Sequence, residues 1–247
     1  MDKDIRPLLK EWHYDASGIS ARWIKGLDQQ PKVQLRLDLG LFQMEMDGRP
    51  DGTTPRGYPS LLDYYHLLEN TTPDISSLSL DETSCSELQQ EAVQYYYRYM
   101  SLYSLRELTR VIRDTQHNLD LFDLVSRRAS DEDLIWQFLQ FYPDVRMMHA
   151  RARAEKSLED DQTDKAIEVL EQGLHDIKKF WGEYGEAEAV EISQEEEILS
   201  DLLHDIQHKK PKSKTGKLRK ELAYAISSED YEKAALLRDK LNELKHD

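Results

Sequence analysis

The sequence predicts a mainly α-helical protein: an array of helical hairpins, a small antiparallel β element near the N-terminus and a helical hairpin at the C-terminus. From about residue 84 onward, apolar residues recur at spacings of three and four, as on one face of a helix. Between residues 33 and 46 they recur at every second position, which is typical of strands. The composition, 39% apolar and 33% charged, fits a helix-rich protein with a large polar surface.

The composition also excludes several classes of function. A formal net charge of −15 argues against non-specific DNA binding by the body of the protein, because the phosphates would be repelled. No apolar run approaches the ~20 residues that a transmembrane helix needs. The first residues lack the apolar core of a signal peptide, and the single cysteine, Cys85, excludes an internal disulfide or a cysteine-clustered zinc site. We therefore expect a cytoplasmic protein without a membrane association.

Residues 1–70 are expected to form a small α/β region. Residues 4–12 have the pattern of a short amphipathic helix, and Ala21 to Lys25 that of a short strand. The alternation of Val33, Leu35, Leu37 and Leu39 predicts a second strand, and that of Phe42, Met44 and Met46 a third. Their parity changes at Gly40, where either a bulge or a tight turn restores the buried face.

The loop that follows the predicted sheet is rich in glycine and proline and carries charges of both signs. Asp47, Arg49, Asp51 and Arg56 make it the best candidate for a small-molecule or peptide site. The alternative is a structural loop that Asp–Arg contacts hold in place, and we favour that alternative.

Two capping boxes mark where helices begin beyond this loop. Ser60 with Asp63 predicts a helix whose inner face carries Leu61, Leu62, Tyr65 and Leu68. A polar linker is expected from Thr71 to Thr83. Ser84 with Glu87 then predicts the first helix of a helical array over residues 84–182.

The array contains two helix pairs that resemble each other. Residues 97–122 and residues 150–177 each hold a helix, a short polar turn and a second helix, although the first turn is interpreted as the shorter one. The second pair has small residues in its first helix and an alanine early in its second, and is similar to a tetratricopeptide (TPR) unit. The expected inner faces are Leu88, Ala92, Tyr95, Tyr99 and Leu102, then Val111, Thr115, Leu119 and Phe122, and then Ile167, Leu170, Leu174, Ile177 and Trp181.

A tyrosine cluster in the first array helix admits two interpretations. Tyr95, Tyr96, Tyr97, Tyr99 and Tyr103 form either part of the core or a stripe that faces a partner. Aromatic residues at helical spacing are more often core, so we favour burial.

We expect an acidic helix over residues 183–208, with Ser193 and Glu196 as its capping pair. His204 and His208 lie one turn apart beside Asp201 and Asp205, a spacing that also suits a divalent metal ion. No other ligand-rich segment supports a metal, so we interpret them as a solvated polar face and predict no metal and no cofactor. Residues 209–217 form a basic linker.

Residues 218–247 predict a helical hairpin. Leu218, Leu222 and Ala225 lie on one stripe of a first helix, and an acidic turn follows at residues 227–230. Ala234, Leu237, Leu241 and Leu244 then form the narrow seam of a second helix. Two helices this short leave an apolar edge that another protein or helix must cover.

The run from Tyr231 to Asp239 after the acidic turn resembles the UVR motif of the UvrB helicase and of UvrC. In those families the motif is a protein–protein docking element, and similar motifs occur in Clp-type ATPases and their adaptors. The resemblance implies a bacterial protein in which Tyr231, Ala234, Ala235 and Leu237 pack against the partner. It further implies that Glu232, Arg238 and Asp239 specify that partner.

The sequence therefore predicts a non-enzymatic interaction or adaptor protein, with no catalytic residues. Its partner would be a protein with a helical hairpin of the UVR or Clp type, in DNA repair or proteostasis. The alternative is an accessory DNA-repair protein that contacts DNA through the basic tether at residues 209–220. Clp adaptors with this motif carry zinc-binding cysteine pairs, which this chain lacks, so the resemblance to them is weaker.

Overall fold

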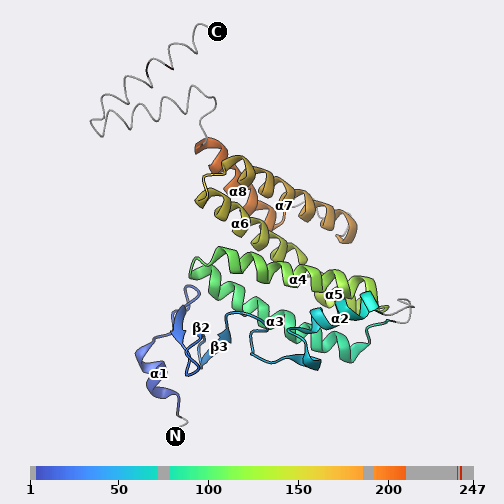
Figure 1. Cartoon of the computed structure of the whole chain (residues 1–247). Coiled ribbons are helices and arrows are strands. Elements are labelled where there is room, and N and C mark those ends of the chain that lie inside the picture. The colour runs from blue at the N-terminus through green and yellow to red at the C-terminus, as the bar shows by residue number, and fades with distance from the viewer. Residues whose placement is uncertain (1–3, 72–77, 186–191, 210–237, 239, 241–247) are drawn as a thin grey trace. The chain divides into compact units, whose positions relative to one another are not determined.

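The computed structural model describes residues 4–71, 78–185 and 192–209, together with Arg238 and Lys240 (Figure 1). It divides the chain into two compact units, Met1–Ser200 and Asp201–Asp247. The first unit is mainly helical and has a small antiparallel sheet near its N-terminus, so the predicted fold class is confirmed. Within the described ranges, no helix is both long enough and apolar enough to span a bilayer.

The sheet has three strands in the order β1-β2-β3, and both pairings are antiparallel. Its central residue Val33 is fully buried and lies opposite Trp23 on one side and Met44 on the other. The strands are β1 (Ala21–Lys25), β2 (Pro31–Arg36) and β3 (Leu41–Glu45).

A tight turn, not a bulge, resets the alternation between the second and third strands. The backbone N–H of Leu37 donates to the carbonyl of Gly40 at 2.9 Å. The prediction that Leu39 continues the buried face is wrong, because Leu39 lies in this turn and is 88% exposed. Strand β2 ends earlier than the apolar pattern suggested, since the chain reverses direction there.

The polar face of β2 is also buried, which simple alternation does not predict. Lys32 pairs with Asp28 at 2.8 Å and also with Glu45, and the side chain of Gln34 donates to Gln43 at 3.0 Å. Because β2 is the central strand, long side chains from both neighbours cover this face.

The helices of the first unit follow the predicted order. The hairpin α3/α4 packs through α4 on the hairpin α6/α7, and α2 lies against α3 and α4 (Figure 1). The bounds are α1 (Arg6–Glu11), the 3₁₀ turn η1 (Pro55–Gly57), α2 (Leu61–Thr71), α3 (Glu82–Ser104), α4 (Leu108–Arg128), α5 (Glu132–Leu139), α6 (Tyr142–Glu159), α7 (Thr163–Tyr184) and α8 (Gln194–Lys209).

Two of the three predicted capping pairs are correct. The Ser60 hydroxyl accepts from the N–H of Asp63 at 3.0 Å, and that of Ser193 accepts from the N–H of Glu196 at 3.3 Å. The cap predicted at Ser84 is wrong, because Asp81 caps α3 and accepts from the N–H of Ser84 at 2.8 Å. Asp is as strong a cap as Ser, so a capping pattern alone does not decide between neighbouring candidates.

The two helical hairpins turn in the same way. Arg106 and Asp161 adopt left-handed conformations, with φ of 63° and 57°. In each turn, the N–H of the next residue donates to the carbonyl oxygen five residues earlier. Glu107 donates to Leu102 at 2.9 Å, and Gln162 donates to Ser157 at 2.8 Å. These bonds define a Schellman cap. The first turn is therefore not the shorter one, and the resemblance between the two pairs extends to their geometry, whereas their similarity to TPR units stays a prediction.

The buried face of α7 is rotated from the predicted one. Leu170 and Ile177 are fully buried, but the centre of the face is Gly173. A Cβ atom there would lie 2.6 Å from Cβ of Ala150 and 3.1 Å from Cδ1 of Leu199. The absence of a side chain therefore lets α6, α7 and the first turns of α8 approach closely. The acidic helix predicted for residues 183–208 begins only at Gln194, since α7 ends at Tyr184.

Candidate functional site

Most of the predicted docking residues lie outside the described residues. Arg238 and Lys240 are helical and exposed, as expected for the second helix of a hairpin. Lys209 ends α8, and the rest of the basic tether at residues 209–220 is not described. The predicted docking residues that lie outside the description are Tyr231, Glu232, Ala234, Ala235, Leu237 and Asp239.

The charged residues of the glycine-rich loop all contact the helices or their own loop. Arg113 of α4 pairs with Asp47 at 2.8 Å, and Gln94 of α3 donates to Asp51 at 3.0 Å. Arg49 lies 3.4 Å from Asp51, and Arg56 pairs with Glu87 at 2.6 Å. These contacts hold the loop against the array, in agreement with the structural interpretation, although most of them run to helices and not within the loop.

Beneath the loop lies Glu91, a fully buried carboxylate of α3. It accepts from the N–H groups of Leu61 and Leu62 at 2.8 and 3.1 Å, at the start of α2, where the helix dipole favours negative charge. His117 and Arg49 each approach it to 3.2 Å. Burial alone raises the pKa of Glu91, but the hydrogen bonds from His117 and the two backbone N–H groups outweigh it, so the pKa lies below its ordinary value.

A second buried ion pair lies about two helical turns further along α3. The guanidinium of Arg98 donates two bonds to Asp114 of α4, at 2.7 and 2.8 Å, and both side chains are fully buried. Its third nitrogen donates to the carbonyls of Glu45 and Gly48, at 3.1 and 2.7 Å. Arg98 therefore ties the end of β3 to the helical array.

Sequence reasoning missed this buried network. The signal was present, because Glu91 and Arg98 fall on the same face of α3 as Leu88, Ala92 and Tyr95. Charged residues on an apolar stripe have to be paired when they are buried. Glu91 lies against Arg49 and His117, and Asp114 pairs with Arg98, so each buried carboxylate of the network has a basic neighbour.

The tyrosine cluster divides between the two interpretations. Tyr95 and Tyr99 are buried, and the ring of Tyr95 stacks on His117 with 3.5 Å between centroids. Tyr96 is 40% exposed, while Tyr97 and Tyr103 are partly buried. One side of α3 is therefore core, and the other carries aromatic surface.

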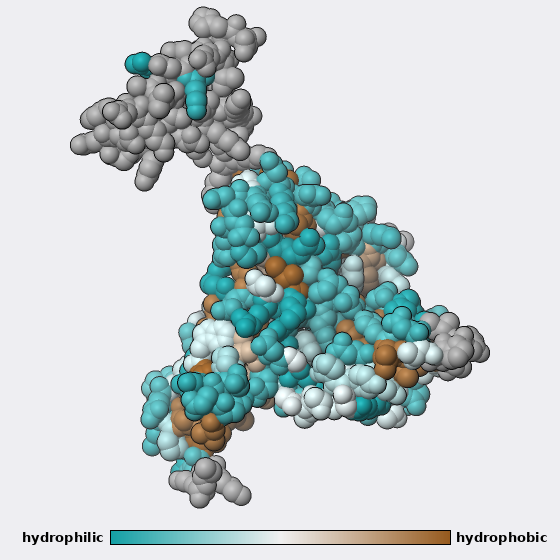
Figure 2. Space-filling view, in the orientation of Figure 1, coloured by the Kyte–Doolittle hydropathy of each residue, from teal (hydrophilic) through white to brown (hydrophobic). Residues whose placement is uncertain are grey.

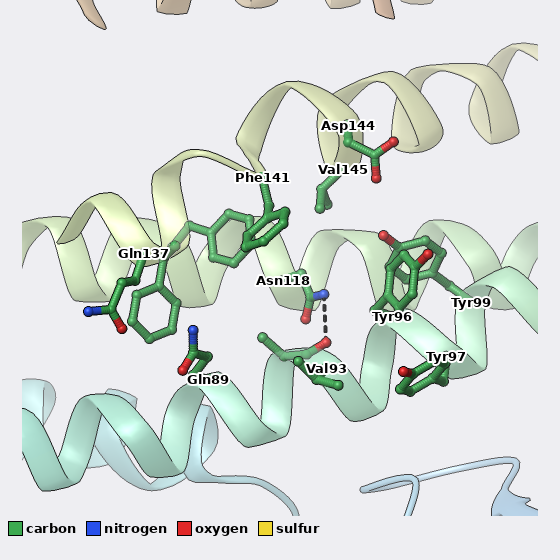
Figure 3. Close-up of a pocket in the computed structure, with 13 residues that line it drawn as sticks. Gln89, Val93, Tyr96, Tyr97, Tyr99, Asn118, Gln137, Phe141, Asp144 and Val145 are labelled. Atoms are coloured by element: carbon green, nitrogen blue, oxygen red, sulfur yellow. Dashed lines mark hydrogen bonds between the residues drawn. The ribbon is translucent and has the colours of Figure 1, made fainter. Parts of the chain in front are cut away.

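That exposed side of α3 borders a hollow with a volume of about 570 Å³ (Figure 3). The hollow lies between α3, α4, α5 and the first turn of α6. Tyr96, Tyr99 and Asp144 lie at one end of it, and Gln89 and Gln137 at the other (Figure 3). The further lining residues are mostly apolar: Ala92, Val93, Tyr97, Asn118, Phe122, Phe138, Phe141 and Val145.

On the face drawn in Figure 2, the surface is mainly hydrophilic, with apolar patches over the N-terminal part of the chain and over parts of the helical array. Ile5, just before α1, and Leu8 within it are 45% and 44% exposed, and no residue of α1 is buried, so the predicted apolar side of this short helix is largely uncovered.

The rings of His204 and His208 lie beside each other on α8, with 3.8 Å between their centroids. The Nδ1 atom of His208 is hydrogen-bonded to the carbonyl of His204 at 2.9 Å, so it is engaged by the backbone. In the part of the chain that the structure describes, no group of three or more His, Cys, Asp or Glu side chains is arranged to hold an ion.

Comparison with protein families matches residues 212–247 to the UvrB/uvrC motif, UVR. The predicted resemblance is confirmed for this C-terminal region, and a motif of this kind implies a protein interaction of the UvrB and UvrC kind. No curated protein and no solved structure matches the chain.

Proposed function

We propose that this protein is a non-enzymatic adaptor that docks a partner protein through its C-terminal UVR hairpin. The observation that supports the proposal is the match of residues 212–247 to the UVR motif. The two fully buried carboxylates of the first unit, Glu91 and Asp114, lie against arginines, which supports a scaffold over an enzyme.

The partner we propose carries a helical hairpin of its own, of the UvrB or UvrC type. Two short hairpins would join their apolar edges into a four-helix contact, with Tyr231 and Leu237 buried between them. The exposed, helical Arg238 would select the partner by its charge. A Clp-type partner is less favoured, because a chain with one cysteine lacks the cysteine pairs of Clp adaptors. A reducing cytoplasm suits this composition.

The helical array would contribute a second surface to the adaptor. Stacked hairpins with equivalent turns are a common way to present an extended binding face. The matching turns at Arg106 and Asp161 support a TPR-like organisation.

Affinity capture tests the hairpin assignment. The full chain and a chain that ends at Lys209 serve as baits in parallel, and mass spectrometry identifies the captured proteins. We expect a UVR-containing protein to be captured by the full chain only. Capture of the same set of proteins by both baits would contradict the proposal.

DNA contact through the basic tether is the second candidate. Its support is the cluster of Lys209, Lys210, Lys212, Lys214, Lys217, Arg219 and Lys220. Such a contact would weaken steeply as salt rises, because bound phosphates release counterions. Fluorescence anisotropy with a labelled duplex at 50 and 200 mM salt distinguishes it, and no binding at either salt concentration would remove it.

A further inference from the structure

We propose that the exposed side of α3 is a second binding site, which takes a peptide segment of a partner protein in which an arginine or lysine is flanked by apolar side chains. The site lies in the first unit and does not involve residues 212–247. It therefore goes beyond the hairpin docking proposed above.

Two hollows meet along α3. The larger, of about 570 Å³, lies between α3, α4, α5 and α6, and the smaller, of about 300 Å³, lies between α3 and β3 with its following loop. Val93 and Tyr97 line both, so they form a ridge between two parts of one surface. Val93, Tyr96 and Phe141 are 46%, 40% and 53% exposed. Exposed apolar residues around a hollow are typical of a binding surface.

Three buried polar atoms on this surface have no hydrogen-bond partner among the described residues. Tyr99 Oη and Asn118 Oδ1 belong to the larger hollow, and Gln94 Oε1 to the smaller. Tyr99 is fully buried and Asn118 is 2% exposed. The Asn118 amide already donates to the carbonyl of Ala92 at 3.0 Å, which leaves its oxygen as an acceptor (Figure 3). An occupant that donates hydrogen bonds would satisfy these atoms.

The charge of the surface selects a cation. Asp144 is the one charged residue that lines the larger hollow, and no cation among the described residues pairs with it. Burial, together with the nearby Glu195, raises the pKa of this carboxyl group. Asp144 lies at the same end of the hollow as the rings of Tyr96 and Tyr99 (Figure 3). A carboxylate beside aromatic faces favours a guanidinium or an ammonium group.

The arrangement favours a peptide over a small molecule. The unpartnered acceptors lie on both sides of the ridge at Val93 and Tyr97, so a ligand confined to one hollow would leave the other unsatisfied. A peptide supplies backbone N–H groups, apolar side chains and a basic side chain in one chain. The net charge of −15 further favours a basic partner.

Selection from a phage-displayed library of random dodecapeptides tests the site on the full chain. We expect enriched peptides to hold an arginine or lysine between apolar residues. Their synthetic forms should bind the wild-type chain and lose about 10-fold or more in affinity with Val93→Glu, because the new carboxylate enters both hollows. Leu67→Glu is the matched control, since Leu67 is 40% exposed on α2 and lines neither hollow, and it should leave the affinity unchanged.

A double-mutant cycle tests the role of Asp144. Replacing the arginine of the best peptide by citrulline removes its charge, and Asp144→Asn removes the charge of the carboxylate. Each change alone should weaken binding by about 10-fold, and the two together by little more than either alone, because they remove one interaction. Circular dichroism of both protein variants confirms that the fold is kept.

Three results would overturn the proposal. The first is a library that yields no binder, which would mean that the unpartnered atoms bind only water. The second is equal affinity of the selected peptides for Val93→Glu and for the wild type, which would mean that the peptides bind at another surface. Additive losses of binding free energy from Asp144→Asn and from citrulline would show that the carboxylate and the basic side chain do not interact. The variants leave residues 212–247 intact, so failure here is distinguishable from failure of the hairpin docking.

Discussion

Arg98 lies fully buried between two helices and a loop, and its guanidinium bonds to Asp114 and to two backbone carbonyls. Asp114 also accepts from Arg113 at 2.9 Å. At the scale of single residues, these bonds replace the water that a buried charge loses on folding. Removing one member of such a set leaves its partner charged and unpaired.

Asp114→Ala should therefore destabilise the protein by about 3–5 kcal/mol, measured as the free energy of unfolding in urea. Asp123→Ala in the same helix is the control. Asp123 pairs with Arg127 at 2.9 Å, but both side chains are largely exposed, so the expected cost is below about 1 kcal/mol. Equal costs for the two variants would show that Arg98 is not held as described.

His149 should make stability depend on pH. Its pKa is lowered from 6.5 to about 4, first by burial and then by Arg146 and Arg153. Between these two pKa values the unfolded chain binds a proton that the folded chain does not. The contribution of His149 to the free energy of unfolding is therefore fully present above pH 6.5 and is lost as the pH falls toward 4. The full loss is on the order of 3 kcal/mol.

Unfolding free energies of the wild type and of His149→Gln, measured between pH 7 and pH 4, test this dependence. The difference between the two curves should shrink as pH falls, because the glutamine variant lacks the titrating group. A constant difference across this range would show that His149 titrates normally in the folded protein.

Cys85 provides a probe of the core. The side chain is 1% exposed, and burial raises the pKa of its thiol. The thiolate is the reactive form, so a thiol reagent such as DTNB should modify the folded protein far more slowly than the protein in denaturant. Rapid modification under native conditions would show that the start of α3 opens readily.

At the scale of elements, periodicity predicted the strands and nearly all the helices. The period of two around Val33 and the period of three and four along α3 and α4 identified buried faces that the structure confirms. Burial of Lys32, Gln34 and Arg36 was not predictable from alternation, because it depends on which strand becomes central. The start of α3 was misplaced because Asp81 and Ser84 are both good caps.

The close packing at Gly173 predicts opposite effects for two glycines of one helix. Gly173→Ala should destabilise by about 1–3 kcal/mol, since its Cβ would overlap Ala150. Gly182→Ala, with no atom within 4 Å of its Cβ, should stabilise by about 0.5–1 kcal/mol through helix propensity. The melting temperatures of both variants, compared with that of the wild type, test this prediction. A Gly173→Ala variant that melts no lower than the wild type would contradict the close approach of the helices.

At the scale of the whole molecule, the chain joins a first unit held by buried charges to a C-terminal region with a UVR motif. A chain that ends at Lys209 should keep the melting temperature of the full chain, because every core residue that the structure describes lies before that point. Differential scanning calorimetry of both chains measures this. A clear drop in melting temperature would show that the hairpin packs on the array.

The candidate sites were predictable to different degrees. The UVR motif is a local pattern, so the sequence alone identified it. The surface along α3 depends on β3, α4 and α6, which come together only in the fold. The tyrosines at residues 95–99 were a visible signal, but their division between core and surface required the direction in which α3 packs.

In the function proposed here, the hairpin docks a UVR-type partner and Arg238 helps to specify that partner. Isothermal titration of the full chain against the purified UVR hairpin of a UvrB-type protein tests it most directly. Arg238→Glu should weaken binding by about 10-fold, because it would invert a charge that the proposed docking places at the contact. Arg153→Glu, the same change at an exposed position of α6, should leave the affinity unchanged. No binding by the wild type, or equal affinities for wild type and Arg238→Glu, would contradict the account.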